Sequence, residues 1–250
     1  MDKQYFRNYS YKLNRDMEGC IYGYAGHPML FIPCQDGRYY DFESFHMAEV
    51  LSPWIDSGKL MVISIDTIDR ETWSDEHGDP GHRSWLHECW MEYIFYEMAP
   101  FIQGIAGQRN GNNDTGIIVM GCSLGATHAV NIYLRRPDIF DGMMALSGIY
   151  TGSYGFGGYS DERVYNNSPV DYMRNFPADH PYIELYNKNR AVICVGQGAW
   201  EQPDTTRELA EEFKAKGINI WVDFWGYDVN HDWPWWFRQA EYFMPYLLNE

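Results

Sequence analysis

The feature that most restricts the fold is a Gly-x-Ser-x-Gly motif at residues 121–125. The apolar residues 117–120 precede it, and residues 124–135 carry small and apolar side chains at the three- and four-residue spacing of a helix. Pro137 then ends that helix, because proline cannot continue it. The motif therefore predicts a strand, a tight turn and a helix in succession, with Ser123 in the turn.

Short apolar runs alternate with longer amphipathic runs over most of the chain. This alternation predicts a single α/β domain over residues 1–250, with a mostly parallel central sheet flanked by helices on both faces. The expected strands are 19–25, 28–33, 60–66, 115–120, 142–147, 191–195 and 219–224. The expected helices are 43–56, 84–104, 124–135, 205–216 and 234–248. The first strands follow one another without a helix, so we expect the sheet to begin with antiparallel strands.

Residues 151–167 show no hydrophobic periodicity and are rich in Gly and Tyr. Stretches of this length without periodicity are often functional when they occur inside a compact domain. The segment is therefore predicted to be a lid-like loop. The alternative is a plain connection on the surface.

Charge and hydropathy exclude several function classes. The formal net charge is −16, so the chain lacks the basic surface that nucleic acids require, and anionic membranes are disfavoured for the same reason. No apolar run approaches the length of about 18 residues that a membrane-spanning helix needs. The first five residues are polar rather than an apolar leader, which predicts a cytoplasmic location. The sequence leaves the oligomeric state open.

Metal and cofactor chemistry is also disfavoured. The five cysteines are scattered and include no Cys-x-x-Cys pair, which favours reduced thiols over disulfides or a zinc site. His77, His82 and His87 recur at five-residue intervals, which does not place them on one helical face. The chain also lacks the Gly-rich motifs that bind phosphate. We therefore expect no metal, no cofactor and a small-molecule substrate.

The position of Ser123 points to a nucleophile. A serine hydroxyl needs an adjacent base, and in strand–turn–helix sites of this kind the chain order is Ser, acid, His. The histidines that follow it are His128, His180 and His231. His128 lies within the helix after the turn, and His180 lies in a turn flanked by prolines. His231 lies between the last expected strand and the last expected helix, so it is the predicted base.

The acid is expected after the strand 191–195, where the sequence offers two candidates. Glu201 is the favoured partner of His231. Asp204 is the alternative, although it directly precedes the helix 205–216 and could serve as its N-cap.

Backbone N–H groups are expected to hold the oxyanion that forms when a serine attacks a carbonyl. The first expected donor is the N–H of Leu124, at the start of the helix after Ser123. The second is expected from the loop 34–42. Arg38 is the favoured residue there, and Gly37 is the less favoured one.

The substrate pocket is expected to be aromatic. Aromatic residues make up 17% of the chain, and many lie in loop-like stretches. Open α/β sheets bind ligands at the carboxyl ends of their strands, and ligand pockets favour aromatic walls. The predicted pocket residues are Tyr39, Trp200, Tyr227 and Trp233. The alternative is that most of these aromatic side chains pack in the core.

A resemblance to a known family rests on short segments, namely 121–125, Pro137-Asp138-x-Phe140, Ala145-Leu146-Ser147-Gly148, Asp36-Gly37-Arg38 and Asn230-His231-Asp232-Trp233. Over about residues 19–248, the chain resembles α/β-hydrolases of the putative-esterase group, which includes esterase D, enterochelin esterase and the mycobacterial mycolyltransferases. The resemblance implies an α/β-hydrolase fold, a Ser–His–acid triad, hydrolysis of esters or thioesters, and no metal. One departure is the acid region, which reads Gly-Ala-Trp-Glu where many esterases place an aspartate.

These observations predict a serine esterase that hydrolyses esters of small acyl groups through an acyl-enzyme. One alternative is an acyltransferase that uses the same triad to deliver the acyl group to an alcohol. A second alternative is a non-catalytic binding module that kept the fold.

Overall fold

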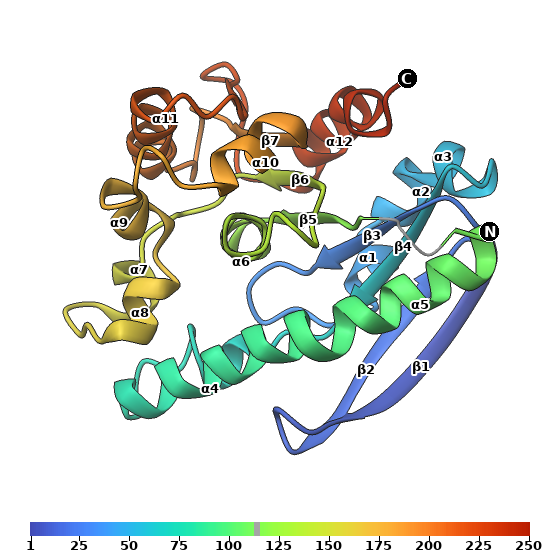
Figure 1. The fold of residues 1–250 in the computed structure, drawn as a ribbon, viewed down its shortest axis with the longest axis horizontal. Coiled ribbons are helices and arrows are strands. Elements are labelled where there is room, and N and C mark those ends of the chain that lie inside the picture. Colours follow the sequence, from blue (N-terminus) through green and yellow to red (C-terminus); the bar gives the residue numbers. More distant parts are fainter. Residues whose placement is uncertain (113–115) are drawn as a thin grey trace.

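The computed structural model describes residues 1–112 and 116–250. These residues form an eight-stranded sheet in the order β1-β2-β4-β3-β5-β6-β7-β8 (Figure 1). The strands are β1 (Lys3–Ser10), β2 (Arg15–Tyr22), β3 (His27–Ile32), β4 (Leu60–Ile65), β5 (Ile118–Cys122), β6 (Gly142–Leu146), β7 (Arg190–Val195) and β8 (Trp221–Phe224). The pairs β1–β2 and β2–β4 are antiparallel, and the remaining pairs are parallel. The predicted sheet, including its antiparallel start, is confirmed.

Helices cover both faces of this sheet, as the sequence pattern predicts (Figure 1). They are α1 (Asp41–Ser44), α2 (Met47–Val50), α3 (Ser52–Asp56), α4 (Pro80–Tyr93), α5 (Ala99–Asn110), α6 (Leu124–Arg135), α7 (Ser153–Phe156), α8 (Glu162–Asn166), α9 (Pro169–Arg174), α10 (Tyr182–Lys188), α11 (Asp204–Ala215) and α12 (Trp233–Leu248). Within the described ranges, no helix has the length and apolar character needed to cross a bilayer.

The strands carry apolar side chains on both faces because each face has its own core. Ile118 and Met120 pack with residues of α1, α2, α3 and α12. Ile117 and Val119 pack on the other face, with residues of α4, α5 and α6. This alternation follows from the two-residue period of a strand. The two cores hold the carboxyl ends of the parallel strands in fixed positions.

The sequence pattern misses β1, the first strand of the N-terminal hairpin. Most of its side chains are exposed, and Phe6 and Ser10 are its buried residues, so it lacks an apolar run. Its partner β2 also begins earlier than the expected strand 19–25. β1 is positioned by pairing with β2 along its whole length. Such pairing leaves little trace in the hydrophobic pattern.

The expected helix 43–56 is divided into the three short helices α1, α2 and α3. His46 interrupts it, because its backbone has a left-handed φ of 65°. The expected helix 84–104 is longer than the pattern indicates, since α4 and α5 are joined by a π-helical turn at Ile94–Met98. The first residue of the expected strand 115–120 lies outside the described residues.

The segment 151–167 is partly helical, because it contains α7 and α8. Phe156 and Val164 of this segment pack with Leu124 in a small separate cluster. The segment is therefore docked on the helix turn that follows Ser123. Its function as a lid stays a prediction.

The turn after β5 requires glycine on both sides of Ser123. A Cβ atom at Gly121 would overlap the backbone of Gly125, and a Cβ atom at Gly125 would overlap the carbonyl groups of Ile32 and Pro33. The start of α6 therefore lies directly against the end of β3. This close approach brings the loop after β3 beside the serine.

Gly125→Ala is expected to destabilise the fold, because its new methyl group meets backbone that cannot move without separating α6 from β3. Overpacking of this kind lowers the free energy of unfolding by about 1–3 kcal/mol. The matched control is Gly104→Ala in α5, where a Cβ atom meets nothing within 4 Å. Alanine at this exposed position should stabilise the helix by about 0.5–1 kcal/mol. Urea denaturation of both variants provides the measurement, and equal stabilities would contradict the packing argument.

Candidate active site

Ser123 lies in the turn between β5 and α6, with a φ of 57° and a ψ of −129°. A residue with a side chain adopts this conformation at a cost, and it persists where the surrounding structure holds it. The Ser123 N–H donates to the Leu146 carbonyl at 2.9 Å, and the Ser123 carbonyl accepts from the Ala126 N–H at 2.9 Å. These bonds fix the turn, and Ser123 lines a cavity at the carboxyl ends of the strands.

His231 lies between β8 and α12, where the sequence places the base. Its Nε2 atom is 2.9 Å from Ser123 Oγ. Its backbone N–H donates to the Ala199 carbonyl at 3.0 Å, which ties this loop to the loop after β7. Its ring meets the Trp236 ring edge-on, with centroids 5.0 Å apart. These contacts hold the imidazole against the serine hydroxyl.

Glu201 lies in the loop after β7, and its side chain is 1% exposed. Its Oε2 atom is 3.3 Å from His231 Nδ1. Its Oε1 atom accepts from Ser147 Oγ at 2.7 Å and from the Gly196 N–H at 3.1 Å. A buried carboxylate needs such donors because removing a charge from water is costly. Both oxygens of Glu201 are therefore engaged, one of them with the histidine.

Asp204, the alternative acid, is not part of this arrangement. Its side chain is 90% exposed and pairs with Arg207 at 3.1 Å. The expectation that Asp204 caps the following helix is also wrong, because α11 begins at Asp204 itself and Pro203 occupies the N-cap position. The structure thus brings Glu201, and not Asp204, to the histidine.

Ser147 was not assigned a role from the sequence, and the structure places it behind the acid. Its hydroxyl donates to Glu201 Oε1 and accepts from Trp236 Nε1 at 2.9 Å. Its backbone φ is 60°, so the turn after β6 is strained as the turn after β5 is. In the sequence, Ser147 is marked only by its position at the end of the expected strand 142–147. That position does not indicate where its side chain points.

Close backbone packing joins the acid loop to the histidine loop. The Gly198 N–H donates to the Val229 carbonyl at 2.8 Å. A Cβ atom at Gly196 or at Gly198 would overlap that same carbonyl. Glycine at both positions therefore permits the approach that carries Glu201 to His231.

Of the two expected oxyanion donors, the structure leaves the N–H of Leu124 available and engages the N–H of Arg38. Leu124 lines the cavity, and its N–H lies in the first turn of α6, where a helix offers no backbone acceptor. The expectation for Arg38 is wrong, because its N–H donates to Asp41 Oδ2 at 3.0 Å. Its guanidinium binds Asp66 and Glu18, and none of these residues lines the cavity of Ser123.

The less favoured donor, Gly37, is also engaged, since its N–H donates to the Cys34 carbonyl at 2.9 Å. Gln35 is the residue of this loop that contacts the cavity wall. Its side chain accepts from the Tyr154 hydroxyl at 3.2 Å and donates to Ser74 Oγ at 2.9 Å. Among the described residues, no acceptor binds the Gln35 N–H.

The cavity beside the serine has a volume of about 130 Å³. Its walls come from the turns after β5, β6 and β7 and from the histidine loop. The lining residues are Ser123, Leu124, Thr127, Ser147, Ile149, Tyr154, Trp200, Gln202 and His231. Trp200 is one of the predicted pocket residues. Tyr154 and Gln202 are not, because they lie in stretches without a hydrophobic pattern.

Three of the four predicted pocket residues lie elsewhere. Tyr39 packs against the rings of Tyr5 and Tyr40 on the β1 side of the sheet. Tyr227 is 81% exposed and does not line the cavity. Trp233 stacks on Phe45 of the α1–α2 connection, with ring centroids 4.8 Å apart. Tyr39 and Tyr227 lie in loops, as the sequence indicates, whereas Trp233 is the first residue of α12. The direction of each side chain depends on its neighbours in space.

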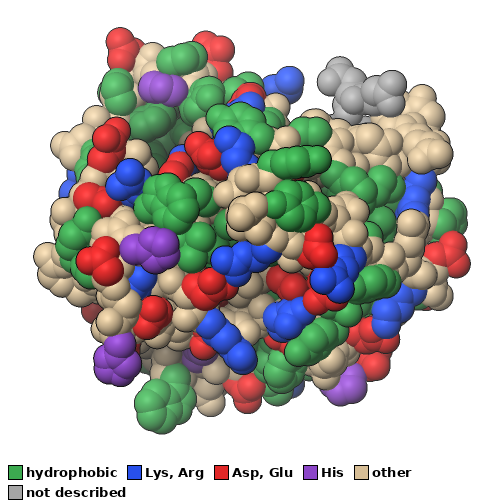
Figure 2. All heavy atoms as spheres, turned by 90° about the horizontal axis from the view of Figure 1, so that it is seen from below, with side chains coloured by type: hydrophobic (Ala, Val, Ile, Leu, Met, Phe, Trp, Pro, Cys, Tyr) green, Lys and Arg blue, Asp and Glu red, His purple; other side chains and the backbone are tan. Residues whose placement is uncertain are grey.

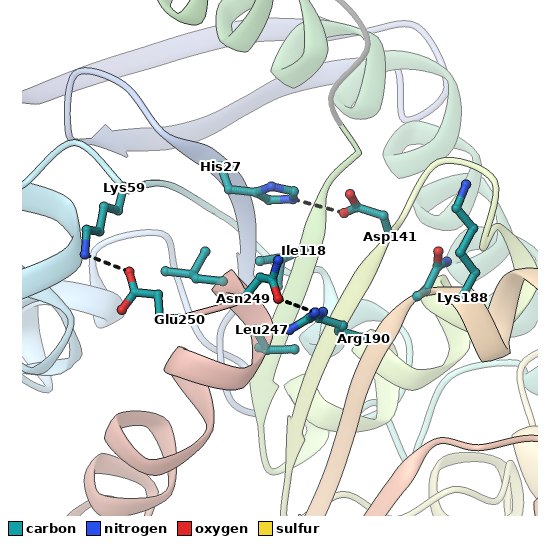
Figure 3. A pocket seen from close by; sticks show the side chains of 11 residues that line it. His27, Lys59, Ile118, Asp141, Lys188, Arg190, Leu247, Asn249 and Glu250 are labelled. Atoms are coloured by element: carbon teal, nitrogen blue, oxygen red, sulfur yellow. Dashed lines mark hydrogen bonds and ion pairs between the residues drawn. The ribbon is translucent and has the colours of Figure 1, made fainter.

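A larger cavity of about 730 Å³ lies at the amino ends of the strands, at the opposite edge of the sheet (Figure 3). His27 opens β3, Asp141 precedes β6, and Arg190 opens β7. His27 Nε2 lies 3.0 Å from Asp141 Oδ1, and Arg190 donates to the Tyr246 carbonyl at 2.7 Å. Its described lining residues include no hydroxyl or thiol nucleophile beside a base. The smaller cavity at the carboxyl ends, where α/β sheets bind ligands, is therefore the candidate active site.

A comparison with models of protein families matches residues 10–240 to the putative esterase family. The chain belongs to this family. The resemblance that rests on the motif at 121–125 and on the histidine loop is thereby confirmed. A comparison with curated protein sequences finds no match.

Solved structures share the fold of this esterase over almost its whole length. A ferulic acid esterase is 16% identical with a TM-score of 0.74, covering 99% of this chain and 98% of that chain. S-formylglutathione hydrolase from Agrobacterium tumefaciens is 14% identical with a TM-score of 0.72, covering 99% and 94%. Mycobacterium tuberculosis MPT51 (FbpC1) is 13% identical with a TM-score of 0.69, covering 100% and 98%. The predicted α/β-hydrolase fold is confirmed. Membership of the putative esterase family makes this protein a carboxylic-ester hydrolase.

The thiols of Cys34 and Cys122, which pack in the same core cluster beneath the turn, are expected to be unreactive. Burial raises the pKa of the Cys34 thiol to about 12 and raises the pKa of the Cys122 thiol well above its usual range. At about pH 8, roughly one Cys34 in 10⁴ is therefore a thiolate, which is the reactive form. Iodoacetamide should leave both residues unmodified in the folded protein, as judged by mass spectrometry, and should leave esterase activity intact. Alkylation of either cysteine with loss of activity would contradict this expectation.

Proposed function

We propose that Ser123 is the nucleophile, that His231 is the general base and acid, and that Glu201 orients His231. The observation that carries this assignment is the continuous contact from Ser123 Oγ, through both imidazole nitrogens, to a carboxylate that is 1% exposed. Burial of that carboxylate strengthens its attraction to the imidazolium that forms during the reaction.

In the first half of the reaction, Ser123 Oγ bonds to the acyl carbon while its proton passes to His231 Nε2. The bond from the acyl carbon to the alcohol oxygen then breaks, and His231 returns the proton to that oxygen. In the second half, a water molecule gives a proton to His231 and attacks the acyl carbon. The bond to Ser123 Oγ breaks, Oγ recovers the proton, and the carboxylic acid leaves.

The oxyanion needs two donors, and we propose the N–H groups of Leu124 and Gln35. The Leu124 N–H lies at the start of α6, where the helix dipole also favours negative charge. The Gln35 assignment replaces Arg38. It is supported by the position of Gln35, two residues after the Ile32–Pro33 backbone that packs on Gly125, and by the contact of its side chain with the cavity residue Tyr154.

The substrate is proposed to be a carboxylic ester or thioester with a small acyl group. The cavity volume of about 130 Å³ corresponds to roughly four water-sized volumes. Such a space suits a short acyl chain and leaves no depth for a fatty acyl tail. The described lining residues include no Asp, Glu, Lys or Arg, which favours an uncharged acyl group.

We also propose that the protein acts in the cytoplasm on a small-molecule ester, without nucleic acid or a membrane surface as partner. Its five cysteines are free thiols, which supports a reducing compartment. Its net charge of −16 repels polyanions. Figure 2 shows a face on which Lys and Arg side chains are interspersed with Asp and Glu instead of forming a basic patch.

Ser123→Ala is expected to lower kcat/KM on an activated acetate ester by about 10³-fold or more, because the variant cannot form the acyl-enzyme. A fluorophosphonate probe should label the wild-type protein and fail to label this variant. The matched control is Ser44→Ala, an exposed serine of α1, which should keep both activity and labelling. Activity of Ser123→Ala within tenfold of the wild type would exclude Ser123 as the nucleophile.

Glu201→Gln is expected to lower kcat by about 10³- to 10⁴-fold, because an amide can hold the wrong tautomer of His231. Asp204→Asn makes the same chemical change three residues away, at a side chain that is 90% exposed, and should stay within twofold of the wild type. Steady-state kinetics on one ester and thermal unfolding of both variants provide the comparison. The reverse ranking would assign the acid role to Asp204.

A further inference from the structure

Trp200 has a strained backbone immediately beside the candidate acid. Its φ is 66°, in the left-handed region that bulky residues rarely adopt. The residues on both sides are anchored. The Ala199 carbonyl accepts from the His231 N–H at 3.0 Å, and the Glu201 carboxylate is buried against the same histidine. Strain of this kind is found where function constrains the chain.

Trp200 is 88% exposed as a residue and yet lines the cavity together with Ser123 and His231. Within residues 1–112 and 116–250, no other aromatic ring contacts it. Other tryptophans behave differently, since Trp90 and Trp236 are buried and each contacts other rings. The strained backbone thus presents a large, unpaired aromatic face to solvent at the mouth of the cavity.

The two sides of the cavity mouth differ in how their side chains are held. On the β3 side, the Tyr154 hydroxyl is tied to Gln35, which is in turn tied to Ser74. On the β7 side stands the exposed indole of Trp200. The inner space of about 130 Å³ has room for a small acyl group, as proposed above. The alcohol part of an ester must therefore extend outward, along the face of Trp200.

We propose that Trp200 is a specificity residue that selects esters whose alcohol part is a planar aromatic ring, by stacking that ring on its indole. This proposal rests on the proposed esterase function and names the substrate class of the same site. Aromatic rings stack favourably beyond the effect of area alone. A cationic alcohol would also suit a tryptophan face, but the described cavity lining provides no carboxylate to balance its charge.

The experiment compares kcat/KM for 2-naphthyl acetate with kcat/KM for 2,2,2-trifluoroethyl acetate, an activated ester without a ring. Because the acyl group is the same, the ratio of the two values reports on the alcohol part. Trp200→Ala should lower the naphthyl-to-trifluoroethyl ratio by about tenfold, and Trp200→Phe should retain most of it. The matched control is Tyr11→Ala, which removes an aromatic side chain that is 85% exposed in the β1–β2 hairpin and should leave the ratio unchanged.

Trp200→Gly provides a second, independent readout. Glycine accepts a positive φ without steric cost, so this variant should raise Tm by about 2–4 °C while losing the naphthyl preference. A tryptophan that served the fold would give the opposite result, namely a lower Tm with an unchanged ratio.

Several results would overturn the proposal. An equal loss for both esters would mean that Trp200 acts by positioning Glu201 and not by contacting the alcohol. A larger loss for acetylcholine than for 2-naphthyl acetate would assign the indole to a cationic group. An unchanged naphthyl-to-trifluoroethyl ratio in an active Trp200→Ala variant would refute the role of Trp200 but not the proposed esterase function. Absence of activity on every ester, together with failure of the fluorophosphonate to label Ser123, would instead refute the proposed function.

Discussion

The site depends on the buried carboxylate of Glu201. A carboxylate that is 1% exposed must replace its lost hydration, and each donor that does so comes from a different loop. Ser147 comes from the turn after β6, Gly196 follows β7, and His231 precedes α12. Satisfying this single anion therefore brings three segments together that are far apart in the sequence. The same requirement explains why a glycine at position 196 packs against the backbone of the histidine loop.

Three residues with strained backbones lie at the carboxyl ends of the strands that form the site. Ser123, Ser147 and Trp200 have positive φ values of 57°, 60° and 66°, and they follow the neighbouring strands β5, β6 and β7. Such residues cost about 1–3 kcal/mol each where they are not glycine. The apolar cores on the two faces hold the strands and so offset that cost. All three residues line the cavity beside Ser123.

The sequence was sufficient to locate the residues whose signals are local. The glycines around Ser123 mark a turn, because only residues without a Cβ atom fit between α6 and β3. His231 could be found from its position between the last strand and the last helix. β1 could not be found, because an edge strand held by pairing needs no apolar run. The break at His46 could not be found either, since a left-handed residue other than glycine has no reliable signature.

The sequence by itself determined the strand–turn–helix unit and the α/β sheet that supports it, because glycine sterics and hydrophobic periodicity act over a few residues. It also placed Ser123 and His231 in the two loops that meet in the structure. The tertiary structure alone decided which carboxylate contacts His231, Glu201 and not Asp204, since burial depends on which loop packs above the carboxylate. It also decided that the Arg38 N–H is engaged with Asp41 and that Trp200, but not Tyr227, reaches the cavity. These choices depend on hydrogen-bond partners and side-chain directions, which are established only when segments distant in the sequence pack together.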